Sequence, residues 1–194
     1  MTKSQLELAL REAGKIARDR DFIVFGSQCI LGTVARPPRA CLISQELDLY
    51  PRSHPQAVML LVQELGARSR FSRREGFFVD CVTPDLAAMP EGWTDRLIPF
   101  STRQTAGVTG WCLELHDLAA SKLAAGRKKD LDYVRTLYSS GLIRLRTLKE
   151  RLQTLPVTSS SLQKIEKLLP TIVAEARKSG SRSKLSKRSR PTGR

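Results

Sequence analysis

The sequence predicts an α/β protein of the α+β kind, with a small mixed β-sheet flanked by helices and an α-helical C-terminal part. Two observations lead to this fold class. Helix-like and strand-like hydrophobic patterns alternate over roughly the first 115 residues, and only helix-like patterns follow from His116 onward. The chain has 194 residues, of which 41% are hydrophobic, so it is long enough for one domain with its own core.

The elements of the first part are predicted from local signals. Ser4-x-x-Glu7 has the form of a capping box, so a helix is expected to begin there. Period-two alternation indicates the second strand, which Pro51 stops, and Gly66 ends the helix after it. In chain order, we expect a helix to about residue 20, a strand over 21–25, a short helix ending near 32, a strand over 41–50, a helix over 57–65, and strands over 77–82, 97–100 and 109–115.

Helices alone are expected in the second part of the chain, over 116–125, 129–139, 142–153 and 159–178. The predicted domain organisation is a sheet-containing domain over 1–140, a helical extension over 141–178 and a disordered basic tail over 179–194. The tail is Ser, Gly, Lys and Arg with a single leucine, so it has too few apolar side chains to form a core.

Positive charge is unevenly distributed. The formal net charge is +14, and the eight Lys or Arg from Arg177 onward leave +6 on the rest of the chain. A basic tail of this kind is suited to contact with a polyanion, and a solubilising tail without a partner is the alternative. Four arginines around Phe71 in residues 68–74, expected to be a loop, could bind RNA phosphates or form a solvated basic loop.

Other classes of protein are less consistent with the sequence. The four cysteines form no C-x-x-C pair, and the two histidines provide no zinc-ligand spacing, so reduced cysteines are expected. No apolar run approaches 18 residues and no apolar signal core begins the chain. We therefore expect a cytoplasmic protein with no membrane association.

The strongest functional signal is Gly26-Ser27 after one strand and Glu46-Leu47-Asp48 within the next. Period two puts both carboxylates on one face of that strand. Glycine lets a backbone approach a phosphate closely, and a hydroxyl with backbone N–H groups at a helix start can bind a triphosphate. Paired carboxylates suit Mg²⁺, which takes its other ligands from water and phosphate. The alternative is that Gly-Ser is an ordinary turn and Glu46 and Asp48 are solvated.

A second block strengthens the interpretation, residues 116–133 with the sequence HDLAASKLAAGRKKDLDY. Gly26-Ser27 and the Glu-x-Asp strand resemble the nucleotidyltransferase fold of polymerase-β-type enzymes. The second block resembles a motif of abortive-infection-type toxin nucleotidyltransferases, which are toxins of toxin–antitoxin pairs. The overall layout looks most like uncharacterised bacterial nucleotidyltransferase-like proteins. The resemblance covers about residues 20–140.

The resemblance implies a role for each matching residue. Gly26 and Ser27 would bind the triphosphate of an NTP, and Glu46 and Asp48 would bind Mg²⁺ or Mn²⁺. Asp80, on the following strand, is the candidate for a third metal carboxylate. In the second block, Lys122 would contact phosphate, and Asp130 would be a further catalytic or structural acid.

Helix geometry predicts a break inside the second block. On one straight helix, Lys122 and Asp130 would lie about 12 Å apart along the axis and roughly 80° apart around it. They would not meet. If Gly126 ends the first helix, a second helix beginning near Lys129 can turn Asp130 back toward Lys122. The alternative is a pair of charged surface helices with a routine salt bridge.

The sequence thus favours a Mg²⁺-dependent nucleotidyltransferase that transfers a nucleoside monophosphate from an NTP to an acceptor. RNA is a plausible acceptor, bound through residues 68–74 and the tail 179–194. The protein could also be a toxin–antitoxin component with an antitoxin partner. A catalytically inactive protein of the same fold, binding nucleotide, nucleic acid or a protein partner, is the alternative.

Overall fold

A five-stranded mixed β-sheet forms the centre of the protein. The structure is a computed structural model that describes residues 1–188, with side chains described through Lys178. The strand order is β3-β2-β1-β5-β4, and strands β1–β5 span Asp21–Val24, Glu46–Pro51, Phe78–Cys81, Ile98–Phe100 and Thr109–Cys112. β1 runs antiparallel to β2 and parallel to β5, while β2 runs parallel to β3. The mixed sheet with its flanking helices confirms the predicted fold class.

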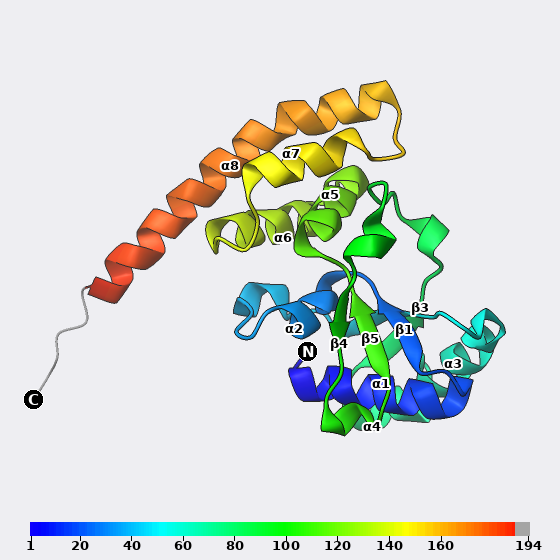
Figure 1. The fold of residues 1–194 in the computed structure, drawn as a ribbon. Coiled ribbons are helices and arrows are strands. Elements are labelled where there is room, and N and C mark those ends of the chain that lie inside the picture. Colours follow the sequence, from blue (N-terminus) through cyan, green and yellow to red (C-terminus); the bar gives the residue numbers. More distant parts are fainter. Residues whose placement is uncertain (189–194) are drawn as a thin grey trace, which may run out of the picture.

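Helices lie both below and above this sheet in Figure 1. The side drawn at the bottom carries three helices, α1 (Lys3–Ala17), α3 (Val58–Leu65) and α4 (Arg70–Glu75). Contact between α1 and the sheet is close at Gly110 of β5, where an added Cβ would lie 2.9 Å from Leu10. Leu6, Ala9, Leu10 and Ala13 are fully buried in this layer, so one face of α1 belongs to the core.

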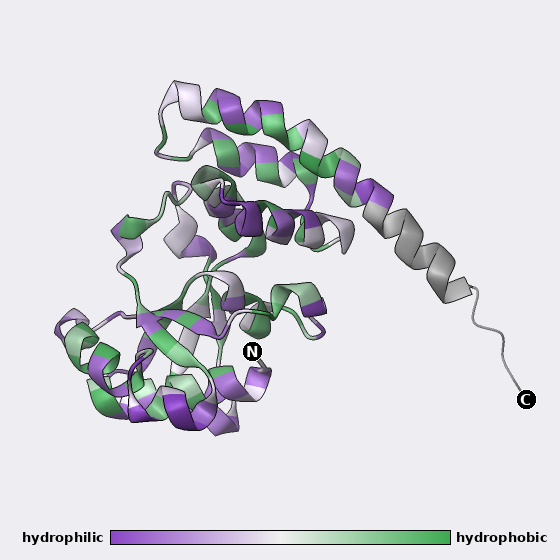
Figure 2. Cartoon of the chain, turned by 180° about the vertical axis from the view of Figure 1, so that it is seen from behind, coloured by the Kyte–Doolittle hydropathy of each residue, from purple (hydrophilic) through white to green (hydrophobic). Residues whose placement is uncertain are grey.

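The opposite side carries the second, purely helical part of the chain. Its helices are α5 (Leu115–Ala125), α6 (Lys128–Ser139), α7 (Leu145–Gln153) and α8 (Ser159–Arg188). α7 and α8 alternate hydrophobic and hydrophilic segments along their length, as amphipathic helices do (Figure 2). The fully buried carboxylate of Asp117 on α5 binds Arg96 at 2.8 Å and Arg151 of α7 at 3.0 Å. Through these two ion pairs, Asp117 joins α5 to α7 and to the segment just before β4.

Several local predictions differ from the structure. The second strand, expected over 41–50, begins at Glu46 and includes Pro51. The capping box at the start of α1 is formed by Thr2 and Gln5, two residues before the expected Ser4 and Glu7. Residues 70–75 form helix α4, capped by the Ser69 hydroxyl, where a loop was expected. The last strand ends at Cys112, because Glu114 caps α5.

The C-terminal helix is longer than predicted. α8 continues to Arg188, ten residues beyond the expected end, and extends past the other helices in Figure 1. Residues 189–194 of the predicted basic tail lie outside the described residues. The boundaries of the predicted domains, at residues 140 and 178, stay a prediction. Among the described residues, no helix is both long and apolar enough to span a membrane.

Candidate active site

Gly26 forms a turn whose backbone conformation strongly favours glycine. It follows β1 with φ 61° and ψ −161°, a conformation that is nearly restricted to glycine. A Cβ atom added there would lie 1.7 Å from Oδ2 of Asp48, so the backbone approaches the carboxylate directly. Ser27 then begins a short 3₁₀ helix, η1 (Ser27–Cys29). The Gly26-Ser27 turn therefore lies against Asp48.

Three carboxylates gather on the neighbouring strands. On β2, Leu47 and Leu49 are buried on one face, which leaves Glu46 and Asp48 on the other. The parallel register of β2 and β3 pairs Asp48 with Asp80, so their side chains share that face. Carboxylate oxygens of Glu46, Asp48 and Asp80 lie within 4.8 Å of one another, and we call these residues the acidic triad.

The electrostatics of the triad are unfavourable for three full negative charges. Burial, with the nearby charges of Glu46 and Asp80, raises the pKa of Asp48 to about 7. Burial and the adjacent Asp80 also raise the pKa of Glu46. A divalent cation would relieve this repulsion, and hard oxygen ligands are those that Mg²⁺ and Mn²⁺ prefer. The donor set therefore fits the metal that the resemblance implies.

The second block folds as two helices joined by a glycine turn. Gly126 ends α5 in the left-handed conformation, with φ 66°, and α6 begins two residues later. The turn brings Asp130 back to Lys122, with 2.9 Å between Nζ and Oδ1. The predicted break at Gly126 is therefore confirmed. The alternative of a surface salt bridge is not, because Asp130 is 1% exposed and Lys122 is 9% exposed.

Lys122 connects this helix pair to the Gly26-Ser27 turn. Its ammonium donates to Oγ of Ser27 at 3.1 Å and lies 4.6 Å from the centre of the Tyr133 ring. The Tyr133 hydroxyl donates to the Ser27 carbonyl oxygen at 2.6 Å. Burial alone would raise the pKa of Asp130, but hydrogen bonds from Lys122 and Arg127 outweigh it and hold that pKa below its usual value. Asp130 is therefore a charged anchor for both cations.

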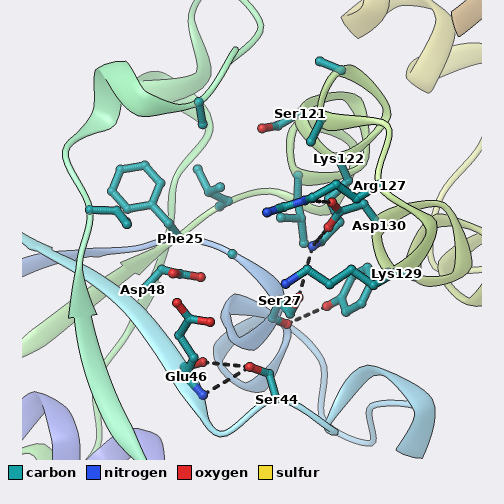
Figure 3. A pocket seen from close by; sticks show the side chains of 18 of the residues that line it. Phe25, Ser27, Ser44, Glu46, Asp48, Ser121, Lys122, Arg127, Lys129 and Asp130 are labelled. Carbon is teal, nitrogen blue, oxygen red and sulfur yellow. Dashed lines mark hydrogen bonds and ion pairs between the residues drawn. The ribbon is translucent and has the colours of Figure 1, made fainter. Parts of the chain in front are cut away.

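These residues line one cleft of about 1050 Å³ between the sheet and the α5–α6 pair. Figure 3 shows Glu46 and Asp48 on one side, Lys122, Arg127 and Asp130 on the other, and Ser27 between them. The cleft is lined by six of the seven residues to which the sequence analysis gave a role: Gly26, Ser27, Glu46, Asp48, Lys122 and Asp130. The seventh, Asp80, does not line it but belongs to the acidic triad. The catalytic and binding roles of these residues stay a proposal.

Other residues of the site were missed or misjudged. Tyr133, Arg127 and Lys129 line the cleft but received no role from the sequence, although all three fall inside the second block. The basic residues of 68–74, in contrast, do not line this cleft. Phe71, at the centre of that cluster, is buried and packs edge-on against Phe77 with ring centres 5.1 Å apart.

Comparison with known proteins agrees with this geometry. The chain matches the model of one protein family, described as nucleotidyltransferase of unknown function (DUF6036), over residues 4–175. No curated protein and no solved structure matches it. The match includes the Gly26-Ser27 turn, the acidic triad and the α5–α6 pair, and it extends through α7 into α8. The chain belongs to this family of nucleotidyltransferases of unknown function.

Proposed function

We propose that the protein transfers a nucleoside monophosphate from an NTP to an acceptor, with Mg²⁺ or Mn²⁺ held by the acidic triad. The observation that carries the proposal is the position of the triad at the Gly26-Ser27 turn in a member of a nucleotidyltransferase family. The bound metal would supply charge neutralisation and alignment of the reacting oxygens. Glu46, Asp48 and Asp80 are the residues that would hold it.

Other residues of the cleft would bind the phosphates, stabilise the developing negative charge and position the lysine that does so. The backbone at Gly26 and the hydroxyl of Ser27 bind the phosphates, because the missing Cβ leaves room for close approach. Lys122 holds the Ser27 hydroxyl and puts a positive charge beside the transferring phosphate, where negative charge develops. Asp130 keeps Lys122 in place through an ion pair. Transfer forms a bond from the acceptor oxygen to the α-phosphorus, breaks the bond from that phosphorus to the oxygen that bridges it to the β-phosphate, and releases pyrophosphate and, to water, the acceptor's proton.

RNA is the acceptor that the charge distribution favours. The cluster around α4 contributes Arg68, Arg70, Arg73 and Arg74, and the C-terminal segment adds eight Lys or Arg from Arg177 onward. Counterion release makes such clusters effective on polyanions. Because residues 68–74 lie outside the cleft, they would hold RNA away from the reacting atoms and not at them.

The test is incubation with each α-labelled NTP, Mg²⁺ or Mn²⁺, and either total RNA or protein extract. We expect label transfer by the wild type and none by Asp48→Asn. The matched control is Asp85→Asn, which removes one exposed carboxylate outside the triad and should retain full transfer. Nucleotide binding without transfer under every condition would favour the alternative of a catalytically inactive, nucleotide-binding protein.

A role in a toxin–antitoxin pair is a finer version of the same proposal. Its support is the resemblance of residues 116–133 to the motif of abortive-infection-type toxins, and the buried Lys122–Asp130 pair fits that motif. The measurement is bacterial growth upon expression of the wild type and of Asp48→Asn, alone and with the neighbouring gene. Growth arrest that requires Asp48 and is relieved by the neighbour would support it, whereas unaffected growth would contradict it.

A further inference from the structure

We propose that Arg127 and Lys129, at the turn between α5 and α6, form the subsite for the terminal phosphates of the nucleoside triphosphate. This inference rests on the proposed function and deepens it. It assigns polyphosphate recognition to two residues that the motif resemblance left without a role. It also separates that recognition from Lys122, whose interactions are within the protein.

Lys122 cannot by itself bind the terminal phosphates of the NTP, which leave as pyrophosphate. Its side chain is about 10% exposed, and its ammonium already donates to Asp130 and Ser27. A third contact is the Tyr133 ring, 4.6 Å away. An ammonium has three donors, so these interactions use most of its capacity. The polyphosphate therefore needs further cations nearby.

Arg127 and Lys129 are two further cations that line the same cleft. The Arg127 side chain is 64% exposed and commits Nε to Asp130 at 2.6 Å, an ion pair that fixes the direction of the guanidinium. Lys129 is exposed and also lines the cleft. In Figure 3, both side chains point toward the side of the cleft that carries Glu46 and Asp48.

These cations lie across the cleft from two members of the triad. Arg127 and Lys129 line the same cleft as Glu46 and Asp48, and Figure 3 shows the two pairs on opposite sides of it. A ligand held between the two sides can therefore contact both. A polyphosphate whose α-phosphate lies at the triad would extend its terminal phosphates to this turn. A guanidinium suits phosphate through paired N–H donors, and an ammonium does so as a point charge.

The chain offers a matched control in Lys128. It is exposed, carries the same charge and lies between the two proposed residues, but it does not line the cleft. Lys128→Gln removes the same charge from the same turn of helix. Any effect of net charge alone should therefore be equal in Lys128→Gln and Lys129→Gln, whereas a direct phosphate contact would separate them.

The experiment measures binding by calorimetry in the presence of Mg²⁺, with inorganic tripolyphosphate, ATP and AMP as probes. We expect Lys129→Gln and Arg127→Gln each to weaken tripolyphosphate and ATP binding about tenfold or more, the loss typical of one charge-assisted hydrogen bond. AMP binding should change by less than about twofold. Arg127→Lys should recover part of the loss, and thermal melting should show that every variant is folded.

The outcomes separate this inference from the proposed function. If the wild type transfers nucleotide but the variants bind tripolyphosphate like Lys128→Gln, the subsite is wrong and the function stands. If no transfer is found but tripolyphosphate binding depends on Arg127 and Lys129, the subsite stands and the function is wrong. Failure of the wild type to bind tripolyphosphate would overturn the inference, whatever the result for transfer.

Discussion

Replacing Asp48 by asparagine should stabilise the metal-free protein at alkaline pH while it abolishes nucleotide transfer. Asp48 lies between Glu46 and Asp80 and against the Gly26 turn. Burial and the two neighbouring carboxylates raise its pKa from 3.8 to about 7, so the fold disfavours its ionised form. Asparagine has nearly the same shape and carries no charge.

The magnitude follows from the pKa shift. A rise of about three units, at about 1.4 kcal/mol per unit, gives an upper bound of about 4 kcal/mol. Because the folded-state pKa is raised, no stability is lost below the unfolded pKa of 3.8, and the loss grows as pH rises from there through about 7. The Asp48→Asn variant has no ionisable group at this position, so its stability does not fall with pH for this reason. The difference between the two proteins should therefore be present in part at pH 5, above the unfolded pKa of 3.8, and be largest at pH 8.

Thermal melting at pH 5 and pH 8, with EDTA or with Mg²⁺, measures this directly. For a chain of this length, each kcal/mol corresponds to roughly 2–4 °C in Tm. With EDTA at pH 8 we expect Asp48→Asn to melt several degrees above the wild type. Addition of Mg²⁺ should raise the wild-type Tm by mass action and leave the variant nearly unchanged. Asp85→Asn is the control for loss of an exposed carboxylate.

Two results would refute the reasoning. If Asp48→Asn melts well below the wild type in EDTA at pH 8, Asp48 has a structural role and its charge is not a source of strain. If Mg²⁺ and Mn²⁺ leave the wild-type Tm unchanged at millimolar concentration, the triad is not a metal site. Either result would remove the main support for phosphoryl-transfer chemistry at this cleft.

Three further predictions concern the same cleft and the tail. Gly26→Ala places a Cβ against Asp48 in a conformation that disfavours side chains, so it should lower stability by roughly 1–3 kcal/mol and abolish transfer, as measured by denaturant unfolding and the label assay. Tyr133→Phe removes the donor to the Ser27 carbonyl and should lower kcat more than it lowers NTP affinity; unchanged kcat would contradict this. Deletion of 179–194 should leave Tm unchanged but weaken RNA binding and flatten its salt dependence, and equal salt slopes would exclude the tail.

The part of the site that the sequence predicted rests on local geometry. Strand parity alone puts Glu46 and Asp48 on one face, because side chains alternate along a strand. Gly126 signalled the break between α5 and α6, because glycine adopts the left-handed conformation at helix ends without strain. Neither inference needs knowledge of distant residues, and the structure agrees with both.

The part that the sequence missed depends on contacts between distant segments. The pairing of Asp48 with Asp80 follows from the β2–β3 register, which joins residues 32 positions apart. Tyr133 reaches Ser27 across 106 positions. No periodicity within either segment specifies such a contact. The family resemblance named Asp80 as a candidate on the following strand, but only the sheet register places it beside Asp48.

The start of α1 and the presence of helix α4 were predicted wrongly, although the sequence contains signals for both. Thr2-Lys3-Ser4-Gln5 fits the capping-box pattern as well as Ser4-x-x-Glu7 does, so the sequence alone leaves the start of α1 two residues uncertain. At α4, Ser69 caps the start and Gly76 adopts φ 72° at the end. The run of arginines between them suggested a solvated loop, but buried Phe71 anchors the short helix to the core.

The Gly26-Ser27 turn directly follows strand β1, but side chains from helices α5 and α6 hold it in place. Lys122 of α5 fixes its hydroxyl, and Tyr133 of α6 fixes its carbonyl. Asp130 pairs with both Lys122 and Arg127, so loss of Asp130 would leave a buried ammonium without its counter-charge. One buried carboxylate thus pairs with the cation that holds the Gly26-Ser27 turn and with the cation proposed to bind the terminal phosphates. The sheet residues alone would supply the triad, but not the positive side of the cleft.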